Sequence, residues 1–521
     1  MRHRRILRYI AGLACAAALP AYAHAAATEP TAAAVTPSTI PDLELQKALV
    51  AAQQAIAAQD CGGALGVLDP LVPRLGDGPQ RAALQRIRLF CLGVEGRAAD
   101  IASVQRELAR SMPADGLVRA YGILVAADEN RYVDAANQLS ALASSAPHSL
   151  EILTGQSVRA ISLQLTREHA YRQRGEMLVA LAKADWQPSD LPELRSSFAQ
   201  GAIETLIAGG KADEAAGLLD RIDQPEMLTS MATERQYAVL WPMIEDRLGP
   251  KSAATADRFA RDRLVFYANN PDAPAALRDA TNAMLVLGRY KEVIEMTDNI
   301  AVQDGMGHEA VQTLMYRARA LSTLKRTEEA GKLLSSVAAL DPRRTPDASS
   351  MIITFAEFLD DTGREQEALT FTREAQTRAA AALSDFGKRW LDRTEICALS
   401  ALGKTAEANA AIDRMKLVST QNQAATIEAM LCARRDAEAA KLAIKAFDDG
   451  DMASNLVAQF QPADAGWAPA PSRLRTLWLA FLSRPDVKAA FERKGRVLPH
   501  TLWPSPVPRT IPHSGDASSL T

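Results

Sequence analysis

The sequence predicts an all-α fold: a superhelical solenoid of about eleven helical pairs with capping helices at its C-terminal end. Two observations support this. Hydrophobic residues make up 48% of the chain but aromatic residues only 5%, and much of the difference is alanine, the residue with the highest helix propensity. Helical stretches of about fifteen residues also alternate with short polar breaks from Asp42 to Gly450. Because 521 residues exceed one ordinary core, a repeat array is expected.

The repeat can be counted from the small or aliphatic residue that follows each break. Most successive positions are separated by a single unit of helix, turn and helix. The intervals from Ala135 to Ala215 and from Ala215 to Val293 are nearly double the others, so each indicates a weaker repeat, around Ala170 and Ala254. The counted positions are Ala64, Ile101, Ala135, Ala215, Val293, Ala330, Ala368, Ala408 and Ala440.

These units resemble the tetratricopeptide repeat, a helix–turn–helix of about 34 residues with a small residue after the turn and a closing proline. Gly288-Arg289-Tyr290 has the form of the turn. The resemblance covers residues 43–450, although most of the repeats are longer than the standard unit. It implies a right-handed superhelix whose concave surface is lined by the first helix of each pair and holds a protein partner. One repeat carries the pattern in Leu314, Ala318, Leu321, Ala330 and Pro342.

The first residues have the pattern of a cleaved signal peptide, residues 1–23. Four arginines precede a short apolar stretch, which ends at Ala21-Tyr22-Ala23. Cleavage takes the formal charge from −3 to −7 and predicts a periplasmic protein with no transmembrane segment in its mature chain. The alternatives are a cut two residues later, a membrane-retained first helix, or a lipoprotein modified at Cys15.

The other segments follow from composition. Residues 24–41, rich in alanine, threonine and proline, are expected to be a disordered linker before the solenoid at 42–450. Prolines within 182–197 and 222–235 are expected to loosen or bend the stack. Residues 451–497 are expected to form a linker and capping helices that fold back on the last repeat, followed by a proline-rich tail at 498–521.

The composition disfavours several functions. There is no basic excess to neutralise phosphates, which argues against nucleic acid. No metal-ligand spacing or catalytic motif is found, so we expect no metal, no cofactor and no enzymatic activity. The adjacent acids Asp360 and Asp361 are interpreted as solvated at a helix end. The expected function is a periplasmic scaffold or adaptor in envelope assembly, secretion or polysaccharide export. The alternative is a cell-wall glycan-acting enzyme with a carboxylate pair in its groove.

The candidate binding residues are polar or aromatic side chains at inward-facing positions of first helices. Arginine and tryptophan often carry binding energy at interfaces, although any one of these residues could instead be solvated surface. The set is Arg86, Arg278, Asn282, Arg319, Glu357, Trp390 and Arg393.

Four cysteines remain after cleavage, and they fall into two pairs. Cys61 and Cys91 are expected at the same end of the stack, while Cys397 and Cys432 are expected on adjacent first helices. An exported chain enters an oxidising compartment, so each pair is a disulfide candidate. The alternative is four buried thiols.

Overall fold

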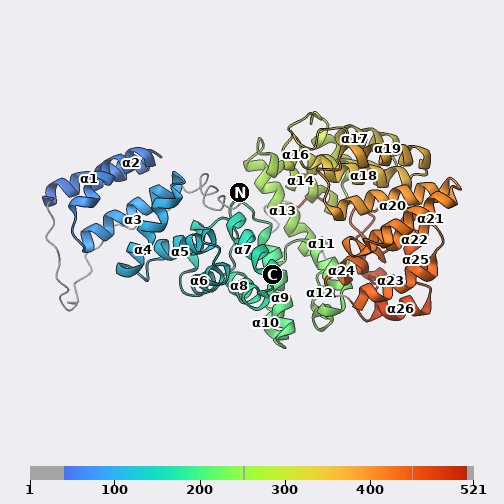
Figure 1. Cartoon of the computed structure of the whole chain (residues 1–521), viewed down its shortest axis with the longest axis horizontal. Coiled ribbons are helices and arrows are strands. Elements are labelled where there is room, and N and C mark those ends of the chain that lie inside the picture. Colours follow the sequence, from blue (N-terminus) through green and yellow to red (C-terminus); the bar gives the residue numbers. More distant parts are fainter. Residues whose placement is uncertain (1–39, 250–252, 449, 513–521) are drawn as a thin grey trace. The chain divides into compact units, whose positions relative to one another are not determined.

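The computed structural model describes residues 40–249, 253–448 and 450–512. The signal peptide and nearly all of the expected linker lie outside these residues. The prediction of an all-α solenoid is confirmed: within the described residues there are helices, short 3-10 turns and one isolated bridge, and consecutive helices pack in antiparallel pairs (Figure 1). No described helix is both long and apolar enough to cross a membrane.

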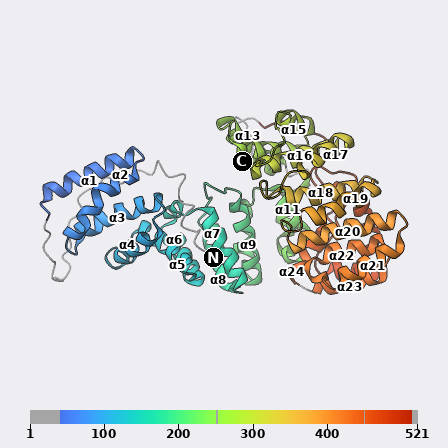
Figure 2. The same ribbon diagram turned by 45° about the horizontal axis from the view of Figure 1, so that its top comes forward.

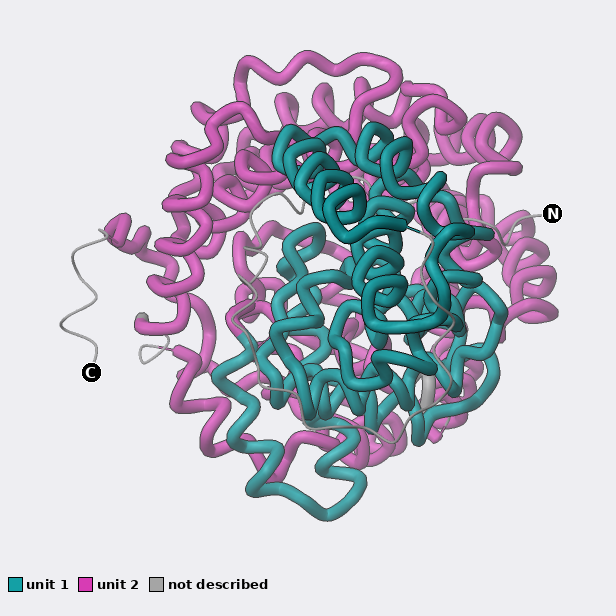
Figure 3. The backbone as a smooth tube through the Cα atoms, turned by 90° about the vertical axis from the view of Figure 1, so that its left-hand side faces the viewer, with its two compact units in different colours: residues 1–222 teal, residues 223–521 magenta. Residues whose placement is uncertain are grey.

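The chain divides into two compact units, residues 1–222 and residues 223–521, coloured separately in Figure 3. The sequence predicts one solenoid over 42–450; the division falls in its proline-containing stretch at 222–235. The helices of unit 1 are α1 Asp42–Ala57, α2 Cys61–Leu68, α3 Pro79–Val94, α4 Ala98–Ser111, α5 Gly116–Asp128, α6 Tyr132–Ser145, α7 Gly155–Arg167, α8 Tyr171–Lys183, α9 Leu194–Ala208 and α10 Ala212–Ala216.

Unit 2 begins irregularly with three helices, continues with regular pairs from α14/α15 to α22/α23, and ends with α24 to α26 (Figure 1). Its helices are α11 Pro225–Thr233, α12 Trp241–Glu245, α13 Ala253–Asn269, α14 Pro274–Val286, α15 Tyr290–Thr297, α16 His308–Thr323, α17 Thr327–Ala338, α18 Ala348–Asp361, α19 Glu365–Arg378, α20 Asp385–Ala401, α21 Thr405–Lys416, α22 Gln423–Cys432, α23 Asp436–Asp448, α24 Gly450–Gln459, α25 Arg473–Phe481 and α26 Pro485–Glu492.

One turn recurs inside every regular pair and explains the breaks in the sequence. The second residue after the first helix has a left-handed backbone, and the N–H of the residue that follows it bonds back to a carbonyl in the last turn of that helix, as in a Schellman motif. In α18/α19, for example, Gly363 has φ +73° and Arg364 N donates to the Leu359 carbonyl over 2.9 Å. The left-handed positions are Gln59, Gly96, Asn130, His169, Gly210, Gly288, Lys325, Gly363, Gly403 and Arg434.

The small residues that set the predicted period lie in the seams between helices. Ala135, Ala330 and Ala368 are fully buried, and so is Ala215. Because alanine adds little bulk, it lets neighbouring helices approach closely. The apolar core is accordingly a series of thin layers along each stack.

The end of unit 2 packs onto its beginning. Thr233 accepts a hydrogen bond from Arg496 N over 2.8 Å, and the Arg496 side chain pairs with Glu245 at 2.6 Å. Farther along, Arg509 pairs with Asp257 at 3.0 Å, so the described part of the proline-rich tail is irregular but packed. The expected capping helices α25 and α26 lie on α22 and α23. In unit 2, the C-terminal segment (residues 461–512) therefore packs back against earlier helices of the same unit.

Candidate functional site

The first helices α18, α20 and α22 of unit 2 lie side by side (Figure 2). Each supplies charged side chains to one buried cluster. Arg393 of α20, fully buried, is at its centre. Its Nε lies 3.0 Å from Glu428 Oε1 of α22, and its Nη1 lies 3.6 Å from Asp360 Oδ2 of α18. Its Nη2 lies 3.4 Å from the partly exposed Glu357. One arginine thus joins three successive repeats.

Burial determines the protonation of this cluster. It raises the pKa of Glu428 to about 7 and that of Asp360 to about 6, although arginines nearby oppose both shifts. The Asp361 carboxyl also has a raised pKa, first because of burial and then because of Glu357. Burial therefore favours the protonated form of these three carboxyl groups.

The C-terminal segment covers the cluster. Trp478 of α25 donates its indole N–H to Glu428 Oε2 over 2.6 Å, and Arg473 donates to Asp360 Oδ1 over 2.6 Å. The neighbouring Asp361 accepts from Ser472 Oγ and from the backbone N–H of Leu474, both over 3.1 Å. The expectation that Asp360 and Asp361 are solvated is therefore wrong, because residues 472–474 and 478 cover this end of α18.

A cavity of about 580 Å³ lies beside the cluster, between residues 461–475 and helices α11, α16 and α18. We call the surface of α11, α16 and α18 that residues 467–475 cover, together with this cavity, the inner groove of unit 2. The charged residues that line the cavity are Glu226, Arg319, Glu357, Asp361 and Arg475. Arg319 donates to the backbone carbonyls of Trp467 and Ala468 and lies 3.6 Å from Glu226. Arg319 in the inner groove therefore binds both main-chain carbonyl oxygens and a carboxylate.

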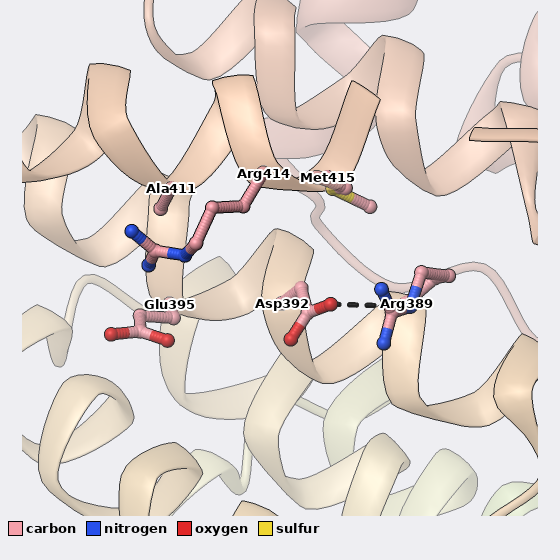
Figure 4. Close-up of a pocket in the computed structure, with 6 residues that line it drawn as sticks. All are labelled: Arg389, Asp392, Glu395, Ala411, Arg414 and Met415. Carbon is pink, nitrogen blue, oxygen red and sulfur yellow. Dashed lines mark ion pairs between the residues drawn. The ribbon is translucent and has the colours of Figure 1, made fainter. Parts of the chain in front are cut away.

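A smaller cavity of about 230 Å³ lies between α20 and α21 (Figure 4). Arg389 Nε and Asp392 Oδ2, both on α20, form an ion pair at 3.2 Å at one end of it, while Glu395 of α20 and Arg414 of α21 lie towards its other end. Burial raises the pKa of Asp392. Its size suits a few waters or a small polar group. Among the described residues, no group of three or more His, Cys, Asp or Glu side chains could hold a metal ion.

The structure brings together four of the seven predicted groove residues. Glu357 and Arg319 line the inner groove, Arg393 lies behind it, and the Arg393 guanidinium is 5.2 Å from the Trp390 ring centroid. Arg393 is not a surface contact, because α25 covers it.

The other three predicted residues line neither the cavity nor the buried cluster. In unit 1, Arg86 pairs with Asp115 at 2.7 Å. In unit 2, Arg278 pairs with its neighbour Asp279 at 2.7 Å and Asn282 is half-buried on α14.

Sequence reasoning missed Glu428, Asp360 and the groove segment. A signal for Glu428 was present: Arg393 and Glu428 have the same separation in sequence as Cys397 and Cys432, so they occupy equivalent repeat positions. No comparable signal marks the segment, because its role depends on the closure of unit 2.

The two cysteine pairs differ in state. Cys397 and Cys432 form a disulfide between α20 and α22, with Cα atoms 5.0 Å apart. Cys61 and Cys91 are both buried in unit 1 as thiols, with no disulfide between them. Burial, and then the hydrogen bond with Cys61, raises the pKa of the Cys91 thiol. Only the second candidate bridge is therefore present.

Comparisons with known proteins add little. No protein-family model and no curated protein matches the sequence. One solved structure that aligns with the chain is Naa15/Naa10 bound to HypK-THB, with 10% identity over 86% of this chain and 73% of that one and a TM-score of 0.24. Another is a circular tandem repeat protein, with 11% identity over 86% and 89% and a TM-score of 0.13. Scores this low carry no argument about fold or function.

Proposed function

We propose that this chain is an exported, periplasmic scaffold that binds segments of other proteins, in envelope assembly, secretion or polysaccharide export. The observation that carries the proposal is how the inner groove of unit 2 holds an extended segment. Arg319 contacts the backbone carbonyls of Trp467 and Ala468, and Asp361 accepts from the Leu474 N–H in the first turn of α25, where the segment becomes helical. Repeat proteins bind partners on their extended concave surfaces, and hydrogen bonds to main-chain atoms together with pockets for a few side chains are one way in which a peptide is recognised.

The proposed compartment is supported by two features. The arginine-rich start with its short apolar stretch has the form of a secretion signal. The Cys397–Cys432 disulfide is a bond that persists in oxidising compartments such as the periplasm.

The experiment is purification of the tagged full-length chain from envelope extract after mild crosslinking. A stoichiometric protein partner is expected in the periplasmic fraction, with an N-terminus near His24 or Ala26. The control is the same chain with Arg319→Ala, which is expected to lose a partner that binds the inner groove. A cytoplasmic chain that keeps Met1, or no partner above the level of an untagged extract, would refute the scaffold.

The alternative is a glycan-acting enzyme. Raised carboxyl pKa values are typical of general acids, and Asp360 and Glu428 have them. Both are, however, buried beneath Arg473 and Trp478, which leaves Glu226, Glu357 and Asp361 on the cavity wall. Turnover of cell-wall glycan by the purified chain, lost in Glu357→Gln, would favour this reading over the scaffold.

A further inference from the structure

The segment in the inner groove has the features of a bound peptide ligand. Trp467 is only 7% exposed and packs with the apolar residues of α14 to α17. Its carbonyl and that of Ala468 accept hydrogen bonds from Arg319. Six residues later, Arg473 reaches the buried Asp360 at 2.6 Å. Between the two anchors the chain is Ala-Pro-Ala-Pro-Ser, with little bulk of its own.

The fit of this occupant is imperfect at Ala468, whose φ is +52°. A left-handed conformation is strained for any residue with a Cβ. The strain persists because the surroundings impose it: Arg319 holds the Ala468 carbonyl, and Tyr290 hydrogen-bonds to the Ala468 backbone. The groove also leaves the Trp467 indole N–H buried without an acceptor. A segment of another protein could bind without a strained residue at this position and with an acceptor for the indole N–H.

We propose that the inner groove of unit 2 recognises an extended, Pro/Ala-rich protein segment that carries a tryptophan and, six residues later, an arginine. Residues 467–473 occupy the groove in cis, and a partner segment of this kind displaces them. This inference rests on the proposed scaffold function and names the class of partner segment. The groove supplies the complementary features: an apolar site among α14 to α17, the Arg319 clamp, and the carboxylates Asp360 and Asp361.

Two substitutions at Ala468 are expected to favour opposite states of residues 467–473, one in which they are bound in the inner groove and one in which they are released from it. Ala468→Pro cannot adopt a positive φ and removes the backbone N–H, so it releases the cis segment without touching a helix. Ala468→Gly accepts the same φ without strain, so it holds the segment more tightly. Both act at one linker residue, and each serves as the matched control for the other.

The probe is a fluorescent peptide of residues 462–476, titrated against the full chain and followed by anisotropy. The Ala468→Pro protein is expected to bind at least tenfold more tightly than wild type, and the Ala468→Gly protein several-fold more weakly. A peptide with Arg473→Ala is expected to lose at least tenfold in affinity for Ala468→Pro, which tests the Asp360 contact without altering the protein. Circular dichroism checks that both variants stay helical.

Equal affinity for wild type and Ala468→Pro would overturn the inference, because the site would then lie outside the occupied groove. So would equal binding of a scrambled peptide, or no binding to Ala468→Pro. These outcomes are independent of the envelope experiment. The scaffold could hold its partner on another surface while the peptide fails to bind, and the peptide could bind although no envelope partner is captured.

Discussion

The indole N–H of Trp478 donates to Oε2 of Glu428 over 2.6 Å, and both side chains are buried where α25 packs on α22. The same carboxylate lies 3.0 Å from the Nε of Arg393, which also pairs with residues of α18. Glu428 therefore couples the C-terminal segment to the repeats that it crosses, and its protonation state affects how firmly unit 2 is closed.

The first prediction concerns pH. Because the pKa of Glu428 rises on folding from 4.5 to about 7, its protonated form is favoured in the native state. Its contribution to stability is complete below pH 4.5, is lost as the pH rises towards 7, and amounts to on the order of 3 kcal/mol. Thermal melts of wild type and Glu428→Gln between pH 4.5 and 8 should differ by an amount that changes with pH. A constant difference would show that Glu428 does not titrate in this range.

The second prediction concerns the left-handed turns. Lys325 has φ +60° where the equivalent residue of the next repeat is Gly363 at +73°. Lys325→Gly should raise the free energy of unfolding by about 0.5–1 kcal/mol, and Gly363→Ala should lower it by about 1 kcal/mol. Urea unfolding measures both. Effects of the same sign at the two positions would contradict the shared turn.

The third prediction concerns the disulfide, which closes a 35-residue separation within unit 2. Replacing Cys397 and Cys432 together by alanine should cost roughly 3–4 kcal/mol on the chain-entropy model. Reductant should lower the melting temperature of wild type but not of the double variant. If wild type melts identically with and without reductant, the bond is either absent or without effect on stability.

The fourth prediction tests the packing of unit 1. A Cβ added at Gly93 of α3 would lie 1.7 Å from the Tyr121 hydroxyl oxygen of α5. Gly93→Ala should therefore destabilise the protein by about 1–3 kcal/mol, and Tyr121→Phe in the same chain should restore part of the loss. Denaturant titration of the single and double variants gives the coupling. Additive effects would mean that α3 and α5 do not meet at these residues.

Much of the fold could be predicted from local signals. The period of buried alanines and the turn residues marked the helical pairs, because both depend on contacts within a repeat or with its neighbour. Glu357, Trp390 and Arg393 were likewise placed on one face by the repeat register, and the structure brings them together.

The burial of Arg393 and Asp360 could not be predicted in this way. It depends on Arg473 and Trp478, which lie several repeats farther along the chain and carry no repeat signal. The contact of Arg496 with Glu245, across 251 residues, is equally invisible to a repeat pattern. Which of the predicted residues are exposed therefore depends on contacts between the C-terminal segment and helices far earlier in the chain.

The central claim is that residues 467–473 lie in the inner groove of unit 2, and amide hydrogen exchange of this stretch tests it most directly. The Leu474 N–H donates to Asp361, the Ala468 backbone hydrogen-bonds to Tyr290, and both Trp467 and Ala468 are buried, so their amide protons are shielded from water. Exchange followed by mass spectrometry should show peptides over 466–476 protected in wild type and exposed in Ala468→Pro, while the α20 and α22 peptides stay protected in both. Exchange of 466–476 in wild type at the rate of a free peptide would contradict the account.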